Sequence, residues 1–325
     1  MMIMYHCIAM ASHTSRRSFI KRSSAAAGVA AFGGIAGCLG GGDTVAISSK
    51  RFTEQRVLGY LAYELLGENL DLEVEDETGL GGTVPNFEAL RENEVDLYWE
   101  YTGTAWLTLP PQQEEVIADP EELHQEVQAE FEEEHDIAVL ERSPLNNTYV
   151  ITARPGWYDE TGIDTLSELA EYANDGNAAD LDPVLGPEFQ ERDDGWPGLL
   201  EHYDFDEDAI ETVNDHVQTV DEDIVYQALD QNEGNIGMGF NTDPRILMFD
   251  LHVFEDDELF FPTYNAVPMV YGETLDANPE IADLLNELSP ELTNERIREL
   301  NAEVAIEERN AQNVAREFLE EEGYI

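Results

Sequence analysis

The chain has 325 residues, of which 71 are acidic and only 16 are lysine or arginine, so its formal net charge is −55. A surface this acidic repels phosphate groups, which argues against a nucleic-acid partner. Apolar residues make up 42% of the sequence and aromatic residues 9%, enough to fill a core and unlike an intrinsically disordered chain.

The acidic residues are spread along the whole chain after Cys38, whereas the segment before it holds four of the basic residues and no acid. The remainder therefore carries 71 acids and 12 bases, a net charge of −59. Repulsion of this size destabilises a compact fold in dilute buffer. At about 1 M salt the Debye length falls to roughly 3 Å and the repulsion is quenched. We expect a protein from an extreme halophile that works in molar salt; a cation-binding acidic protein is the alternative.

The N-terminal segment has the pattern of an export signal. A twin arginine within 15–21 precedes a weakly apolar stretch rich in Ala and Gly, which is typical of the Tat pathway. Small residues lead to Cys38, as at a lipoprotein cleavage site, and this apolar run is too short and glycine-rich to span a bilayer. We predict a Tat lipoprotein signal over 1–37, and a lipidated cysteine with a glycine-rich tether over 38–43. The protein is then expected on the extracellular face of the cell membrane, held by its lipid anchor only.

Strand and helix patterns alternate in the rest of the chain, which predicts an α/β fold with mainly parallel sheets. A Thr and a Glu three residues apart mark one helix start as a capping box. The predicted elements, in chain order, are a strand over 44–50, a helix over 53–67, a strand over 70–75, a loop over 79–83, a helix over 84–93, a strand over 95–101, a strand over 150–153, the capping-box helix over 165–173, a helix over 221–231, a strand over 235–240 and a helical region over 278–321.

An internal similarity relates 87–101 to 226–240. Both segments read aromatic, any residue, Ala-Leu, two residues, Asn-Glu and then a strand that ends in an aromatic, and they align without a gap. This predicts two similar lobes with Tyr101 and Phe240 at the carboxyl ends of their strands, the edge where open α/β sheets bind ligands. A coincidental helix–strand unit is the alternative.

The sequence offers no convincing catalytic set, so we predict no enzymatic activity, no metal and no cofactor. The histidines have no metal-ligand spacing, and there is neither a nucleophile elbow nor a phosphate loop. Binding chemistry remains: a quaternary ammonium has no N–H to donate and is held by ring faces in an aromatic cage. Lys50 is the only lysine after Cys38, which singles it out as a candidate partner for a ligand carboxylate.

Three motifs carry a family resemblance. Lys50-Arg-Phe-Thr-Glu-Gln55, Leu80-Gly-Gly-Thr83 before an aromatic-Glu-Ala-Leu helix, and Glu100-Tyr101-Thr-Gly-Thr104 occur in this order. Together they resemble the glycine betaine/proline betaine/choline-binding proteins of osmoprotectant ABC importers, and the resemblance runs from about residue 44 to the C-terminus.

The resemblance implies a ligand site of eight residues. In that family the trimethylammonium group lies in a box of aromatics, and the ligand carboxylate meets a Lys, an Arg and a Thr. Asn147 stands where some relatives carry Asp, and Phe240 where relatives commonly have Tyr. Carried onto this sequence, the cage walls are Tyr101, Tyr149, Phe240 and Tyr264, the carboxylate partners are Lys50, Arg192 and Thr104, and Asn147 lies near the ammonium.

The resemblance also implies a type II periplasmic-binding-protein fold, two-lobed, with the ligand cleft between the lobes. We place lobe 1 at 44–145 plus 258–325 and lobe 2 at 146–257. The protein would capture a quaternary-ammonium compatible solute, glycine betaine first among them, close as a monomer, and dock on the permease and ATPase subunits of an importer. A choline or carnitine receptor of the same family is the main alternative. An enzyme on this scaffold or a structural surface lipoprotein are the others.

Overall fold

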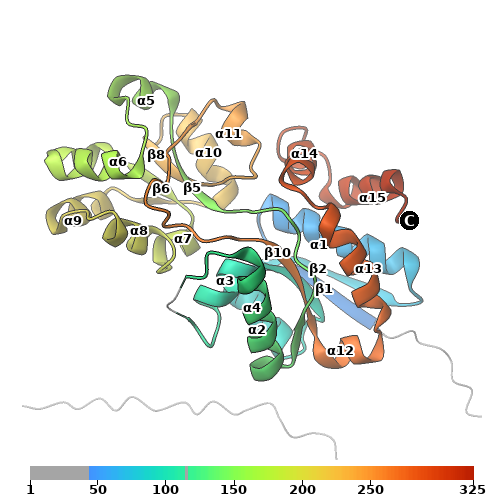
Figure 1. The fold of residues 1–325 in the computed structure, drawn as a ribbon. Helices are drawn as coiled ribbons and strands as arrows, with labels where there is room; N and C mark the ends of the chain where they lie inside the picture. The colour runs from blue at the N-terminus through green and yellow to red at the C-terminus, as the bar shows by residue number, and fades with distance from the viewer. Residues whose placement is uncertain (1–43, 114–115) are drawn as a thin grey trace, which may run out of the picture. The chain divides into compact units, whose positions relative to one another are not determined.

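Two five-stranded sheets carry the fold in a computed structural model that describes residues 44–113 and 116–325 (Figure 1). The predicted export signal at 1–37 and the predicted tether at 38–43, with its lipid site at Cys38, lie outside the described residues. Within the part of the chain that is described, no helix has the length and apolarity needed to cross a membrane.

The first sheet has the strand order β2-β1-β3-β10-β4. β1 runs parallel to β2 and β3, whereas β10 is antiparallel to β3 and β4. β1 is buried along nearly its whole length because the sheet is covered on both faces, as is usual for parallel strands. The strands are β1 (Thr44–Lys50), β2 (Glu73–Gly81), β3 (Leu97–Tyr101), β4 (Ile137–Val139) and β10 (Ala266–Tyr271).

The helices around this sheet form, with it, the part that we call lobe 1. α4 shows how local sequence sets a helix start: the Asp119 carboxylate accepts hydrogen bonds from two first-turn amides, and a proline follows it. α13, α14 and α15 lie beside α1 in Figure 1. The helices are α1 (Thr53–Asn69), α2 (Thr83–Arg91), α3 (Thr102–Thr108), α4 (Pro120–His135), α12 (Gly272–Ala277), α13 (Glu280–Leu288), the 3₁₀ turn Ser289–Glu291, α14 (Asn294–Ala305) and α15 (Ala311–Glu322).

The second sheet has the order β7-β6-β8-β5-β9 and forms lobe 2 with its helices. Again the parallel strands, β6 with β7 and β8, are joined to an antiparallel one, β5. The strands are β5 (Tyr149–Ala153), β6 (Pro183–Leu185), β7 (Gln218–Thr219), β8 (Ile236–Phe240) and β9 (His252–Val253). The helices are α5 (Pro155–Thr161), α6 (Leu166–Tyr172), the short turns Ala173–Asn177 and Ala178–Asp180, α7 (Pro187–Glu191), α8 (Trp196–His202), α9 (Glu207–Asp215), α10 (Glu222–Asp230) and α11 (Arg245–Met248).

The internal sequence similarity corresponds to one structural unit that occurs in both lobes. α2 leads into β3 as α10 leads into β8, and each helix is followed by an asparagine with left-handed backbone, Asn93 (φ 54°) and Asn232 (φ 59°). Asparagine tolerates this conformation better than most residues, which suits it to a tight helix-to-strand turn. The aromatics Tyr101 and Phe240 end the two strands, as predicted.

β2 differs from its prediction: it begins at Glu73 and continues to Gly81, through the segment predicted to be a loop. It lies at the edge of the sheet and is mostly exposed, so its hydrophobic alternation is a weak guide to its length. The pairing with β1 is interrupted by a bulge near Gly79, whose φ of +79° suits glycine. After the bulge Gly81 pairs with Lys50, which brings the start of α2 beside that lysine.

The chain passes between the lobes twice, after β4 and after β9. The two connections run side by side: Asn146 and Asn265 form an isolated antiparallel bridge, and the Asn147 amide donates to the Tyr264 carbonyl oxygen at 3.0 Å. The predicted lobe boundaries, at 145/146 and 257/258, fall in these connections; their positions stay a prediction.

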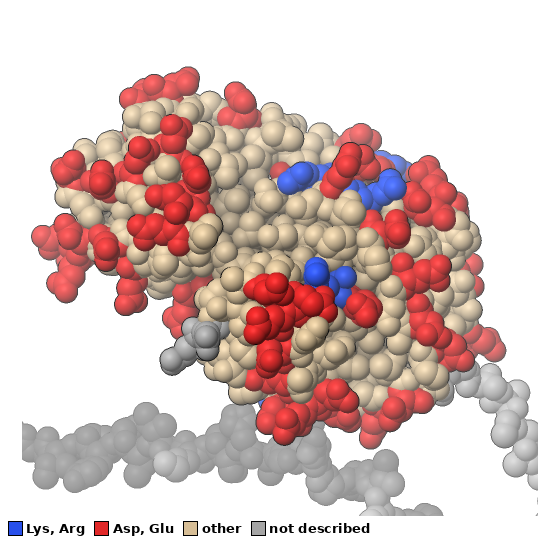
Figure 2. Space-filling model, in the orientation of Figure 1, with Lys and Arg blue, Asp and Glu red and all other residues tan. Residues whose placement is uncertain are grey.

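Acidic side chains are spread over both lobes on the face drawn in Figure 2, and basic side chains gather at only a few places there. Such a surface is self-repelling in dilute buffer and is tolerated when salt is concentrated.

Candidate functional site

All eight residues predicted to contact a ligand line one cavity between the lobes. Phe52 is a further wall. The cavity has a volume of about 20 Å³, which is room for roughly one water molecule. Its walls therefore lie against one another, and a trimethylammonium group enters only when they separate. The lining residues are Lys50, Phe52, Tyr101, Thr104, Asn147, Tyr149, Arg192, Phe240 and Tyr264.

Strand ends bring the aromatic residues together. Tyr101 is the last residue of β3 and Phe240 the last of β8. Tyr149 begins β5 and is the register partner of Phe240, while Tyr264 lies two residues before Ala266, the partner of Tyr101. The rings thus collect at the edge where the carboxyl ends of the parallel strands lie, the usual ligand edge of open α/β sheets.

The rings contact one another closely, with Tyr149 at their centre. Its centroid lies 5.3 Å from that of Phe240, 5.4 Å from that of Tyr264 and 4.8 Å from that of Phe189. The Tyr264 ring is nearly perpendicular to it, at 80°. Burial raises the pKa of the Tyr149 and Tyr264 hydroxyls well above their ordinary range, so both stay neutral and present uncharged rings.

Phe52 is an aromatic wall of the cavity that was not predicted from the sequence. It precedes α1, is buried, and stacks on Phe240 at 4.9 Å and on Tyr101 at 6.5 Å between centroids. Tyr101 and Phe240 were predicted to meet across the cleft; Phe52 lies against both. The signal was present, because Phe52 belongs to the Lys50–Gln55 motif, but an aromatic just before a helix is also an ordinary packing residue.

Lys50 is buried and already paired. Its ammonium donates to Glu100 at 2.6 Å and to the Thr83 hydroxyl at 2.8 Å, and lies 5.3 Å from the centroid of the Tyr101 ring. Burial raises the pKa of Glu100, and the charge of Lys50 opposes that rise. The only lysine after Cys38 thus forms a buried ion pair at the cavity wall.

Arg192 follows α7 and holds a second carboxylate. Its guanidinium forms two hydrogen bonds with Asp194, one of them from Nε at 2.7 Å, and donates to the Thr104 hydroxyl at 3.3 Å. The Tyr264 hydroxyl also donates to Asp194, at 2.8 Å. Arg192 and Thr104 therefore meet from opposite lobes.

The two cations predicted to bind a ligand carboxylate each bind a carboxylate of the chain, Glu100 or Asp194. A ligand carboxylate must share these cations with the protein's own acids or displace them. Neither acid was predicted as a partner of these cations. Glu100 belongs to the third motif, but in a chain with 71 acids a carboxylate gives no sign of which cation it binds.

Asn147 lines the cavity with a neutral amide. Its Oδ1 lies 3.0 Å from the oxygen of the Thr242 hydroxyl, whose single proton is donated to Glu54 at 2.6 Å. The buried Nδ2 of Asn147 has no hydrogen-bond partner in the described part of the chain. It is a neutral polar wall beside Phe240 and Phe52.

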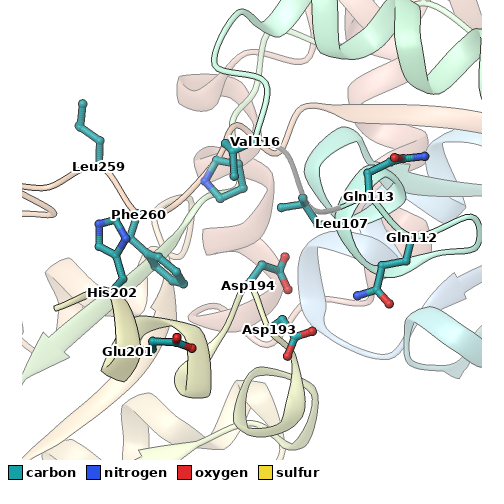
Figure 3. Close-up of a pocket in the computed structure, with 11 residues that line it drawn as sticks. Leu107, Gln112, Gln113, Val116, Asp193, Asp194, Glu201, His202, Leu259 and Phe260 are labelled. Carbon is teal, nitrogen blue, oxygen red and sulfur yellow. The ribbon is translucent and has the colours of Figure 1, made fainter. Parts of the chain in front are cut away.

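A larger hollow, of about 980 Å³, opens beside the cavity (Figure 3). Asp194 joins the two spaces, since it lines the hollow and binds Arg192 and Tyr264 of the cavity. Figure 3 shows Asp193 and Asp194 between Glu201 on one side and Gln112 on the other. Of the aromatic side chains, His202 and Phe260 line the hollow, whereas five aromatic rings line the smaller cavity, which is therefore the candidate ligand site. Among the residues that the structure covers, no group of His, Cys, Asp and Glu is arranged to hold a metal ion.

The fold is that of a type II periplasmic binding protein, as comparison with solved structures shows. A crystal structure of a glycine betaine/carnitine/choline ABC transporter superposes with a TM-score of 0.65 at 25% identity, covering 86% of this chain and 99% of that one. Apo YehZ from Escherichia coli superposes with a TM-score of 0.60 at 24% identity, covering 87% and 99% of the two chains.

Residues 43–321 match the substrate-binding domain of ABC-type glycine betaine transport systems, and the chain belongs to that family. Its members bind substrates for transporters and are not enzymes. The chain is 30% identical over 288 residues to CosB, a chemotactic signal transduction system substrate-binding protein of Halobacterium salinarum, covering 87% of this chain and 85% of CosB. It is 30% identical over 283 residues to a glycine-betaine-binding protein of Pseudomonas aeruginosa, covering 86% and 88%. The resemblance drawn from the three motifs is confirmed.

Proposed function

We propose that the protein captures a quaternary-ammonium compatible solute outside the cell and delivers it to an ABC importer, with glycine betaine as the leading ligand. The observation that carries this proposal is the convergence of five aromatic rings with Lys50 and Arg192 on one buried cavity. Each ring face attracts a desolvated cation with about 2 kcal/mol or more, so the rings suit the trimethylammonium group.

The other end of the ligand is assigned to Lys50, Arg192 and Thr104. A carboxylate between them would receive charge-assisted hydrogen bonds in a buried setting, where such bonds are strong and salt screens them little. Because Glu100 and Asp194 already hold the two cations, the carboxylate adds a third acceptor to an existing network.

Closure around the ligand follows from the origin of these side chains. Lys50, Tyr101 and Tyr264 come from lobe 1, and Tyr149 and Arg192 from lobe 2. A ligand that touches both sets stabilises the closed form, and the closed form would then dock on the permease. We propose that the molecule acts as a monomer, exported by the Tat pathway and tethered by a lipid on Cys38.

A choline or carnitine receptor is the second candidate, favoured by the ion pairs. With Lys50 held by Glu100 and Arg192 held by Asp194, the charges at that end of the cavity are balanced without a ligand carboxylate. A ligand without a carboxylate, such as choline, would leave this balance undisturbed.

A chemotaxis transducer is an alternative to the ABC importer as the partner that receives the ligand-bound protein. CosB, a relative at 30% identity, belongs to a chemotactic signal transduction system. A strain that lacks this gene would fail to accumulate betaine under osmotic stress if the partner is an importer. Loss of swimming toward betaine with uptake intact would instead assign a transducer.

Calorimetric titration of the protein without its signal, in multimolar KCl, tests the proposal. We expect saturable binding of glycine betaine, loss of binding in Tyr101→Ala and weakened binding in Lys50→Ala, with choline and proline as comparison ligands. Binding of choline without betaine would move the assignment to the second candidate. A folded sample that binds no quaternary ammonium contradicts both.

A further inference from the structure

Five acidic residues are buried in the described part of the chain, and four of them are neutralised. Salt bridges join these four to a Lys or Arg at 3.2 Å or less. Glu54, which is 3% exposed, is the exception, since no Lys, Arg or His of the described residues lies within salt-bridge distance of it. The four pairs are Glu64 with Arg316, Glu100 with Lys50, Asp194 with Arg192, and Glu222 with Arg51.

Neutral donors surround the Glu54 carboxylate. One oxygen accepts from the Tyr101 hydroxyl at 2.7 Å, and the other accepts from the Thr242 hydroxyl at 2.6 Å and from the Asn301 amide at 3.1 Å. Three donors to one carboxyl group suit its ionised form, which only accepts hydrogen bonds. These hydrogen bonds favour the carboxylate form of Glu54, and no salt bridge among the described residues balances the charge of that form.

Glu54 lies directly behind the aromatic end of the cavity. Its hydrogen bond fixes the hydroxyl of Tyr101, a cage wall. It also lines a hollow of about 10 Å³ that shares Phe52, Asn147 and Phe240 with the cavity. These three shared side chains lie between the hollow that Glu54 lines and the cavity where the rings converge.

We propose that Glu54 supplies the counter-charge for the quaternary ammonium of the ligand, so that the bound ligand provides the cation that this buried carboxylate lacks. The inference rests on the proposed function and assigns a specificity residue to the same site. Glu54 acts through Tyr101: a phenol that donates to a carboxylate has a more electron-rich ring, and the negative charge adds a direct attraction in a medium of low dielectric constant.

Among the described residues, the other acids near the cavity are already paired. Asp223 and Asp243 bind Arg245, and Glu188 lies 3.9 Å from Arg192. Glu100 and Asp194 are held by Lys50 and Arg192, and Asn147 is neutral. Concentrated salt does not remove the effect, because screening acts weakly on buried charges. The exposed acids of the surface, in contrast, contribute little attraction in molar salt.

The proposal has a consequence for pH. Burial raises the pKa of Glu54, and hydrogen bonds from Thr242, Tyr101 and Asn301 oppose that rise. A bound cation favours the ionised carboxylate, so affinity for the cation is full above the raised pKa and falls as the pH drops through it. Three other titratable groups face Glu54: the Tyr101 phenol and the carboxylates of Asp223 and Asp243. Asp243 also raises the pKa of Glu54, and Arg245 forms salt bridges with both aspartates.

A neutral isostere separates charge from shape. Choline and 3,3-dimethyl-1-butanol differ only in the replacement of the ammonium nitrogen by carbon. We expect Glu54→Gln to weaken choline binding about tenfold, to change binding of the alcohol less than twofold, and to remove the pH dependence of choline binding. Glu64→Gln is the matched control: Glu64 is also buried and on α1, but it pairs with Arg316, so this change should leave both affinities unaltered.

Equal losses for choline and the alcohol would overturn the proposal, because they would assign Glu54 to packing or to lobe closure through Thr242. So would unchanged choline affinity. If Glu54→Gln does not fold, the choline-to-alcohol affinity ratio of the wild type decides, measured as the pH is lowered from the alkaline range to the ordinary pKa of a glutamate. A falling ratio supports the proposal and a constant ratio contradicts it. A wild type that binds no quaternary ammonium at any pH removes the proposed function and this inference together.

Discussion

The two ends of the cavity are built on opposite electrostatic plans. At the polar end, Lys50 and Arg192 are each satisfied by an acid of the chain, so the charges are balanced before a ligand arrives. At the aromatic end, Glu54 has no salt-bridge partner among the described residues, and the nearest cations, Lys50 and Arg192, lie 5.3 and 5.7 Å from the centroids of the Tyr101 and Tyr149 rings.

The difference separates two kinds of ligand recognition. A cation completes the aromatic end and gains the full attraction of the rings and the carboxylate. A carboxylate at the polar end must compete with Glu100 and Asp194, which costs part of what it gains. The aromatic end is therefore expected to set affinity, and the polar end to set the ranking among ligands that share a trimethylammonium group.

The largest effect is expected at the polar end, and on stability. Lys50→Met leaves Glu100 buried without its cation, and loss of one member of a buried pair costs about 3 kcal/mol or more of unfolding free energy. The pKa of Glu100, already raised by burial, rises further. The variant should therefore lose stability as the pH rises through that raised pKa, and it should regain stability as the pH is lowered toward the ordinary pKa of a glutamate. Urea unfolding at constant multimolar KCl measures this.

The matched double variant sharpens the result. Adding Glu100→Gln to Lys50→Met removes the unpaired charge and should restore more than half of the lost stability. If the stability losses of Lys50→Met and Glu100→Gln simply added in the double variant, the two residues would be energetically independent. The interpretation that they balance each other's charge would then be wrong.

The next largest effect is expected at the aromatic end, and on affinity. Tyr149→Leu removes the ring that touches Phe240 and Tyr264, and a ring worth about 2 kcal/mol corresponds to roughly thirtyfold weaker binding of betaine. Tyr149→Phe keeps the ring and should stay within about threefold of the wild type. Calorimetry in multimolar KCl gives both values; a strong loss in the Phe variant would show that the hydroxyl matters more than the ring face.

The smallest effect is expected where the lobes meet beside the polar end. The Glu188 carboxylate of α7 accepts from the Thr83 amide at 2.5 Å and its hydroxyl at 2.8 Å, at the start of α2 in the other lobe. Burial alone would raise the pKa of Glu188, but Lys50, Thr83 and Arg192 hold it below its ordinary value. Its contribution to closure is thus present above the ordinary pKa and lost as pH falls through the lowered one.

Glu188→Gln should weaken betaine affinity about threefold at neutral pH, as expected for one carboxylate at a helix start. The comparison is the affinity of variant and wild type as the pH is lowered stepwise from 7, and the two affinities should converge once the pH has fallen through the lowered pKa of Glu188. A difference that persists unchanged at the lower pH would exclude Glu188 as a charge-dependent contact between the lobes.

The residues that surround the cavity could be located from sequence motifs. These residues lie at strand ends or helix starts, and the local sequence pattern determines the positions of those ends. Tyr101 and Phe240 were found through the duplicated helix–strand unit. The capping box at Thr165 and Glu168 was also read correctly. The ligand roles of the cavity residues remain predictions for the experiments above.

Sequence could not reveal which acids are buried. Glu54 meets Tyr101 across 47 residues and Asn301 across 247. It belongs to the Lys50–Gln55 motif, but the motif does not show which of its side chains are buried. Glu100 and Asp194 are equally ordinary in so acidic a chain. Burial of a charge is decided by tertiary packing, which local periodicity does not record.

The two side-by-side connections between the lobes lie next to the cage, since the Asn147–Tyr264 hydrogen bond belongs to them. Side chains at a pivot travel little when two bodies rotate, whereas those far from it sweep a long arc. If the lobes part about these connections, Asn147 and Tyr264 are expected to remain near their places, whereas the contact between Glu188 and Thr83 is expected to break. Substitutions of Asn147 or Tyr264 should therefore alter which solute is bound, and substitutions of Glu188 or Thr83 should alter the rate at which the bound solute dissociates.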